Sequence, residues 1–242
     1  MATRTGYASE VDLDVQGDWQ LVTDGARVEV VQAPVLAGFM PATPGDVWEY
    51  RSTQQGTPPL YSRERIVSAS QRGGLWVARM CSEVDELAAA LSERDLVIAA
   101  AGVLPDIGTM TSGSGPVYTR ETRGLYLPHA LPVGLRWTWA QQLEMPGATL
   151  EVTGTAEVVA IERVTVPAGS FEAVCVRGEI FSRVHLSSPA GSPPIESVQR
   201  DSSHWVRGLG LVRSISLGPP DQQRVKLLVA YDVRGAPPGL GG

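Results

Sequence analysis

The chain has 242 residues, 43% of them hydrophobic, which is enough to bury a substantial core within one large domain. Its net charge of −6 at pH 7 argues against non-specific binding to nucleic acid, because such binding requires clustered Lys and Arg side chains that displace counterions from phosphates. Only 19% of the residues are charged, and the 26 Gly and 18 Pro residues favour an all-β chain of many strands joined by turns over one with long surface helices.

The compartment is constrained only weakly by the sequence. The beginning, "MATRTGYASEVDLDVQ", has no apolar run of signal-peptide length, and no stretch of the chain reaches the ~18 unbroken apolar residues of a membrane span. Cys81 and Cys175 each lie in an alternating, strand-like run, where a single Cys is typically a small buried hydrophobe, and a disulfide between them is the less favoured alternative. We therefore expect either a cytoplasmic protein or the processed form of an exported one.

The first part of the chain is predicted to contain a β-hairpin and then a β-meander. Residues 1–38 are interpreted as an N-terminal extension, in which Asp24 and Gly25 lie between two β-rich runs over 18–32, a pattern typical of a primed two-residue turn. After a proline-rich segment come "VWEYRST" and "SRERIVSASQRGGLWVARMCSEV", and the Arg-Gly-Gly in the second run supplies a turn between two strands.

A short helix is predicted over residues 83–94. Ser82 and Asp85 resemble a capping box, and three apolar residues spaced three or four apart share one helical face. The next run, "DLVIAAAGV", either continues this helix or forms a buried strand, because its periodicity does not separate the two.

The rest of the chain is predicted to be β-structure with intervening loops. Residues 106–116 are interpreted as one such loop and the following "VYTRETRGLYLP" as a hairpin. Alternating polarity predicts long strands in "LRWTWAQQLEM" and "ATLEVTGTAEVVAIERVTV", and a last strand in "RVKLLVAYDV". The tail, residues 234–242, offers nothing to bury and is predicted to be disordered.

Five motifs follow one another in a characteristic order: "FMPATPGDVWEY", "LPHALPVGLRWTW", "VTVPAGSFEAVCV", "HWVRGLGLVRS" and "LLVAYDV". Over residues 39–233 the chain thereby resembles the TapB-like family of exported bacterial domains of unknown function, and the run at 166–173 is the most specific of its motifs. The resemblance implies a mainly all-β fold: a curved antiparallel sheet or half-barrel meander with at most one or two short helices. It also implies a concave apolar face like that of periplasmic lipoprotein carriers, and strands rather than a helix over 83–101.

Two aromatic pairs follow glycine-led turns. Gly45 precedes Trp48 and Tyr50, and a second glycine precedes Trp137 and Trp139 with the same spacing. Because side chains two residues apart on a strand share a face, each pair is expected to place two large rings on one side of the sheet. Their main expected role is core packing, and the alternative is the wall of an apolar ligand site.

No pattern in the sequence points to catalysis, a cofactor or a metal ion. The three histidines, His129, His185 and His204, lack metal-binding spacing except that Asp201 precedes His204 by three residues, and surface or hydrogen-bonded histidines are the better interpretation. The serines of "TSGSGP" lack the setting of a nucleophile elbow, and no phosphate-binding loop or Cys-x-x-Cys is present. We therefore expect no catalytic, cofactor-binding or metal-ligating residues and lean against an enzyme.

Two functions remain. The favoured one is a structural or protein-interaction subunit, which would recruit an unknown partner through the N-terminal extension or an edge strand. The alternative is a carrier or binding module for an apolar or lipid-like ligand, and an apolar cavity of roughly 300 Å³ or more would support it. The side chains expected to line such a site are Trp48, Tyr50, Trp137, Trp139 and Phe171.

Overall fold

Within the part of the chain that the structure describes, the secondary structure is entirely β. The computed structural model describes residues 10–13, 19–20, 38–54, 56–72, 75–84, 92–104, 110–112, 115–187, 193–218, 222–234 and 236. The strands are β1 (Glu10–Leu13), β2 (Trp19–Gln20), β3 (Val47–Gln54), β4 (Leu60–Arg72), β5 (Leu75–Val84), β6 (Ser92–Ala99), β7 (Gly102–Val103), β8 (Met110–Ser112), β9 (Gly115–Gly124), β10 (Leu127–Pro128), β11 (Arg136–Met145), β12 (Ala148–Val166), β13 (Gly169–Leu186), β14 (Ile195–Val206), β15 (Gly210–Gly218) and β16 (Gln222–Asp232). No helix occurs among these residues, so none is long and apolar enough to cross a membrane.

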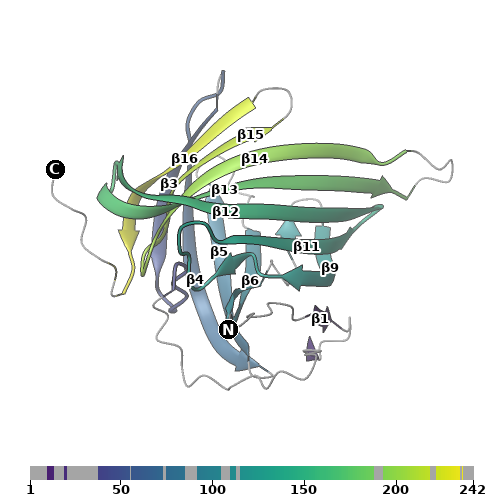
Figure 1. Cartoon of the computed structure of the whole chain (residues 1–242). Coiled ribbons are helices and arrows are strands. Elements are labelled where there is room, and N and C mark those ends of the chain that lie inside the picture. Colours follow the sequence, from purple (N-terminus) through teal and green to yellow (C-terminus); the bar gives the residue numbers. More distant parts are fainter. Residues whose placement is uncertain are drawn as a thin grey trace, which may run out of the picture.

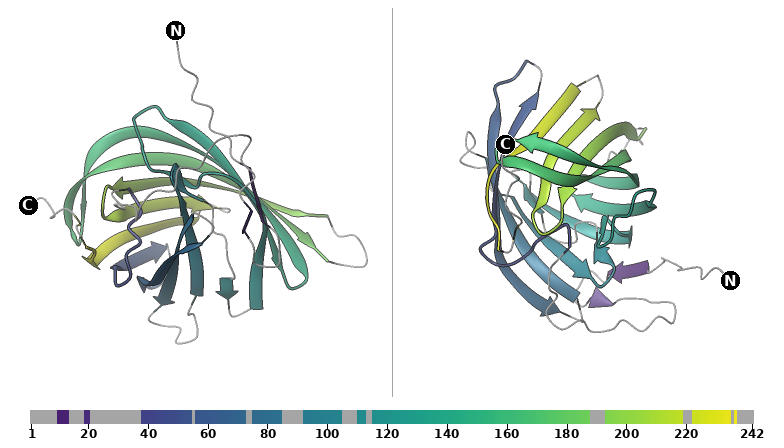
Figure 2. Two further views of the ribbon diagram at one scale, coloured as in Figure 1. Left: turned by 90° about the horizontal axis from the view of Figure 1, so that it is seen from below. Right: turned by 60° about the vertical axis from the view of Figure 1, so that its left-hand side comes forward.

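The described strands form one curved antiparallel sheet that does not close (Figures 1 and 2). The order across it is β10-β7-β6-β5-β4-β3-β16-β15-β14-β13-β12-β11-β9-β1-β2, and β8 pairs with β9 beside this path. From β11 to β16 each strand pairs with the next along the chain, and β16 then pairs with β3, which joins the C-terminal strands to the meander β3–β6. The predicted all-β fold and curved antiparallel sheet are confirmed.

A short crossing of the chain joins β9 to β10, which lie toward opposite ends of this sheet. β9 ends at Gly124, whose φ of 73° lets the backbone turn away from its partner β11, and only Leu125 and Tyr126 separate it from β10. β10 pairs with β7 at the opposite end of the strand order. The predicted hairpin in "VYTRETRGLYLP" is therefore wrong, because its two halves pair with different strands. The loop predicted over 106–116 is also partly replaced by β8 and by the start of β9.

The helix predicted over 83–94 is wrong at both of its described ends. Val84 ends β5 and Ser92 begins β6, and the two strands form an antiparallel ladder in which Ser82 lies opposite Ser92. Residues 85–91 lie outside the described residues. Pairing with neighbouring strands and burial of residues 96–98 override the local helical signal, because sheet hydrogen bonds and burial together outweigh helix propensities of a few tenths of a kcal/mol per residue.

Both glycine-led turns predicted from the sequence occur. Gly45 and Gly134 have φ angles of 96° and 88°, and β3 and β11 begin two residues after them. Residues other than Gly rarely adopt such angles, so the glycines permit the tight entry into each strand. The two turns are locally alike, but the aromatic pairs that follow them differ in burial.

A single large core cluster draws on strands from β3 to β16 and on the segment before β3. Cys81 and Cys175 are buried, free thiols, so the expectation of small buried hydrophobes is confirmed and the disulfide alternative is wrong. The hairpin predicted over 18–32 lies outside the described residues apart from β2, and of the tail only Arg234 and Ala236 are described. The largest fully buried side chains include Phe171, Ile66, Met80, Leu96, Leu209 and Leu228.

Candidate binding pocket

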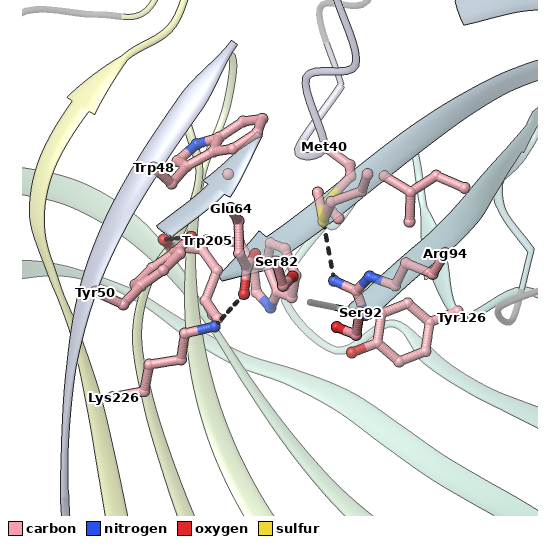
Figure 3. A pocket seen from close by; sticks show the side chains of 14 residues that line it. Met40, Trp48, Tyr50, Glu64, Ser82, Ser92, Arg94, Tyr126, Trp205 and Lys226 are labelled. Atoms are coloured by element: carbon pink, nitrogen blue, oxygen red, sulfur yellow. Dashed lines mark hydrogen bonds and ion pairs between the residues drawn. The ribbon is translucent and has the colours of Figure 1, made fainter. Parts of the chain in front are cut away.

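A pocket of about 260 Å³ opens on the concave face of the sheet (Figure 3). Its walls come from β3, β4, β5 and β6 on one side and from β14, β15 and β16 on the other, with Met40 and Tyr126 added from connecting segments. Strands that far apart in the sheet can line one cavity only if the sheet bends around it, which places the pocket on the inner side of the curve. The curvature is therefore what creates the site.

One wall is built from the first aromatic pair. Trp48 and Tyr50 are each only 3% exposed, and both reach across to β15 or to the turn before it. Trp48 Nε1 donates a hydrogen bond to the Leu209 carbonyl at 2.7 Å, and the Tyr50 hydroxyl donates to the Leu211 carbonyl at 3.1 Å. These rings thus combine core packing with a surface toward the cavity.

An ion pair lies beside that wall. Lys226 Nζ is 2.6 Å from Glu64 Oε1, with side-chain exposures of 25% and 14%, and the ammonium group also lies 3.9 Å from the centroid of the Tyr50 ring. Burial raises the pKa of Tyr50 well above its ordinary value, Glu64 raises it further, and Arg94 opposes that rise. The phenol therefore remains a neutral hydrogen-bond donor at neutral pH, and the cation is stabilised by both a carboxylate and a ring face.

The opposite wall carries a second cation. Arg94 of β6 lines the pocket together with Ser82 and Ser92, and its Nη2 lies 3.3 Å from the sulfur of Met80. Figure 3 shows the Arg94 head group near Ser92 and Tyr126. With Lys226 and Glu64, the charged lining residues have a formal sum of +1 (two cations and one carboxylate). The pocket thus joins aromatic walls to a polar, net positive side.

The structure brings together only part of the predicted aromatic set. Trp48 and Tyr50 line the pocket, whereas Trp137, Trp139 and Phe171 are not among its lining residues. Phe171 is 2% exposed and packs edge-on against a tyrosine ring of β16 at a centroid distance of 6.1 Å. Trp137 and Trp139 lie near Tyr126: Trp137 Nε1 donates to its carbonyl at 3.3 Å, and the Trp139 ring meets its ring edge-on.

The polar lining residues Glu64, Arg94 and Lys226 were not singled out from the sequence. The one available signal was that Lys226 is the single lysine of the chain. Glu64 and Lys226 are 162 residues apart, so their pairing depends on the β16–β3–β4 contacts and could not be read locally.

The histidines are distributed over separate places. His129 Nε2 contacts the Ala99 carbonyl at 2.9 Å, and His185 Nε2 lies 3.5 Å from Glu151 on the surface. His204 lies opposite Cys175, ten residues along β13 from His185, so the two histidines are far apart and share no site. Asp201 is opposite Gly178, and burial raises its pKa.

Comparisons with known proteins identify the fold. No protein-family model and no curated protein sequence matches the chain. A protein of Parabacteroides distasonis, proposed to be a lipoprotein, has a similar structure with a TM-score of 0.57 and 13% identity over 81% of this chain and 98% of its own. A protein of Bacteroides fragilis, proposed to be exported and described as having a YmcC-like fold, gives a TM-score of 0.55 and 14% identity over 81% and 99%. The chain therefore shares an all-β fold with these proteins, and membership of the TapB-like family stays a prediction.

Proposed function

We propose that the chain is a non-catalytic binding module whose concave pocket takes a small ligand, or the end of a longer one, with an apolar body and an anionic group. The observation that carries the proposal is the meeting, in one cavity, of the Trp48 and Tyr50 rings with the cationic groups of Arg94 and Lys226. Pockets that combine apolar walls with a few placed polar groups are the usual form of small-molecule sites.

The size of the cavity limits the ligand. Its volume of about 260 Å³ is below the ~300–1,000 Å³ of pockets that hold drug-sized ligands and below the threshold that we set from the sequence. A short acyl chain or a small aromatic acid fits these limits better than a whole lipid. Burial of hydrocarbon would contribute about 0.8 kcal/mol per methylene.

The compartment is part of the same proposal. The two similar structures belong to proteins proposed to be a lipoprotein and an exported protein. We extend that location to this chain as the processed form of an exported protein, and the TapB-like resemblance supports the same location.

The pocket is tested by filling it. Ser82→Phe adds a ring to the lining, so we expect the affinity for a fluorescent medium-chain fatty acid to fall at least tenfold. Ser70→Phe makes the same change at an exposed position of β4 and is the matched control, for which the affinity should be unchanged. Fluorescence titration measures both, and a fatty alcohol of the same length should bind more weakly than the acid.

Equal binding to the parent chain and to Ser82→Phe would contradict the pocket as the site. A parent chain that binds neither probe at micromolar concentration would contradict the ligand class. The alcohol separates the two parts of the proposal. If the acid and the alcohol bind with equal affinity, the pocket still binds an apolar ligand, but recognition of an anionic group is contradicted.

A second candidate, the interaction subunit favoured by the sequence, is supported by β1. This strand of the N-terminal extension pairs with β9 and places Val11 opposite Thr122, so the extension already adds a strand to the end of the sheet.

Removal of residues 1–37 should abolish co-purification of a partner and leave a folded domain, since Gly38, whose carbonyl accepts the Gly208 N–H, is retained. Affinity purification of both forms, with circular dichroism as the folding control, measures this; partner recovery unaffected by the deletion would contradict the role.

A further inference from the structure

A cluster of three metal-ligating side chains lies on the opposite face of the sheet from the pocket. Glu162 of β12 and His204 of β14 flank β13, on which Cys175 lies directly opposite His204 and Ala173 lies opposite Glu162. Consecutive residues of a strand point to opposite faces, and His204 and Trp205 pair with consecutive residues of β13 without a register shift, so His204 points away from the pocket that Trp205 lines.

Small residues on the middle strand make the cluster possible. Ala173 and Cys175 are two residues apart and share the face of Glu162 and His204. Their short side chains let Glu162 reach over β13, so that its Oε1 lies 2.6 Å from His204 Nε2. The contact therefore spans three strands and involves residues 42 positions apart in the sequence.

The two buried side chains of the cluster, His204 and Cys175, make few hydrogen bonds within the protein. The His204 side chain is 4% exposed, and its Nδ1 has no hydrogen-bond partner among the described residues. The Cys175 thiol is buried and has one weak contact, 3.7 Å from the Ser202 hydroxyl. Buried polar atoms in folded proteins nearly always have a partner, so an imidazole with one unpaired nitrogen at this buried position calls for a physical explanation.

The donor set and its dimensions match zinc. One ligand atom from each of Glu162, Cys175 and His204 lies within 4.8 Å of the others. With Zn–N and Zn–O distances of ~2.0–2.2 Å and a Zn–S distance of ~2.3 Å, tetrahedral ligands are about 3.3–3.6 Å apart. The Glu162 Oε1–His204 Nε2 distance of 2.6 Å is shorter than that spacing, and the 50% exposed Glu162 side chain can rotate outward to reach it and also leaves a route for the ion. Calcium and magnesium prefer all-oxygen sites, so the thiol and the imidazole disfavour them.

We propose that Glu162, Cys175 and His204 bind one Zn²⁺ ion, with the fourth position left to water or another ligand. Binding displaces the thiol proton to solvent and forms the Zn–S bond, so no redox change is involved. The thiolate and the carboxylate together balance the charge of the ion, which lets a thiolate exist at this buried position. The site does not depend on the pocket, because the two lie on different faces.

The experiment uses the full chain, freed of metal with a chelator and titrated with Zn²⁺ against a competing chromophoric chelator. We expect one ion per chain with a Kd below 1 µM, and affinity losses of at least tenfold for Cys175→Ser and Glu162→Gln. Cobalt(II) bound in place of zinc should show thiolate-to-metal charge-transfer absorption, which Cys175→Ser should abolish.

Two matched controls are available in the same chain. Cys81→Ser changes the other buried thiol. Glu151→Gln changes a carboxylate of β12 that pairs with His185 of β13 on the surface. Both variants should bind zinc as the parent chain does. Less than one ion per chain at micromolar free zinc, or cobalt binding without the charge-transfer band, would overturn the site. Because Glu162 is half exposed, Glu162→Gln should fold even if Cys175→Ser does not, and its unchanged affinity would also reject the proposal.

Discussion

Replacement of Trp48 by alanine is expected to lower the free energy of unfolding by about 3–5 kcal/mol. Trp48 is 3% exposed, belongs to the main core cluster, and donates a 2.7 Å hydrogen bond to the Leu209 carbonyl from a distance of 161 residues in the sequence. Its removal leaves a cavity and also an unsatisfied buried carbonyl, and each of these destabilises the fold. Urea unfolding followed by circular dichroism gives the free energy.

Two further variants separate the causes of this loss. Trp48→Phe keeps most of the apolar volume and removes the indole donor, so it should cost about 1–3 kcal/mol. Trp137→Ala removes the equivalent ring after the second glycine-led turn, where the indole is only partly buried, and should cost no more than about 2 kcal/mol. If Trp48→Ala and Trp137→Ala prove equally destabilising, the distinction between a buried and a partly exposed aromatic pair is incorrect.

Phe171→Ala is expected to destabilise the chain to a similar extent, by about 3–5 kcal/mol. Phe171 is among the largest fully buried side chains and contacts the Tyr231 ring edge-on, so truncation removes burial and an aromatic contact together. It lies near the start of β13, where it is opposite Val164. The loss should appear in urea unfolding as a lower midpoint at unchanged slope.

Phe181→Ala is the matched control for this prediction. Phe181 lies on the same strand but is only partly buried, and the Arg183 guanidinium lies 5.5 Å from its ring centroid. We expect a cost of about 1–2 kcal/mol, because the wild-type ring keeps part of its contact with solvent. A larger effect at Phe181 than at Phe171 would contradict the position of the core described above.

Local patterns predicted much of the β-structure. The alternating runs over 135–145 and 148–166 became β11 and β12 with nearly the expected bounds, and the last strand became β16. The helix predicted over 83–94 is wrong at its described ends because a capping pattern carries no information about neighbouring strands. In the structure, β5 and β6 gain more from their ladder and from the burial of residues 96–98 than the isolated segment would gain as a helix.

The candidate sites were much less predictable than the fold. The aromatic pairs at Trp48 and Trp137 have the same local sequence signal, yet only the first lines the pocket. The polar side of the pocket and the Glu162–Cys175–His204 cluster were missed, because each depends on residues far apart in the sequence that strand register brings together: Glu64 and Lys226 are 162 positions apart, and Glu162 and His204 are 42 apart.

By itself, the sequence determined the class of the fold, the positions of most strands and the glycine-led turns at Gly45 and Gly134. These features depend on properties that act over a few residues: a side-chain period of two and the access of glycine to positive φ. Only the tertiary structure decided which strands pair, which face of each is buried, and which charged groups meet. Those outcomes depend on hydrogen bonding and burial summed over the whole curved sheet. Glu64 meets Lys226 only once β16 has paired with β3, next to β4. Likewise, Glu162 meets His204 only once β12 and β14 have each paired with β13.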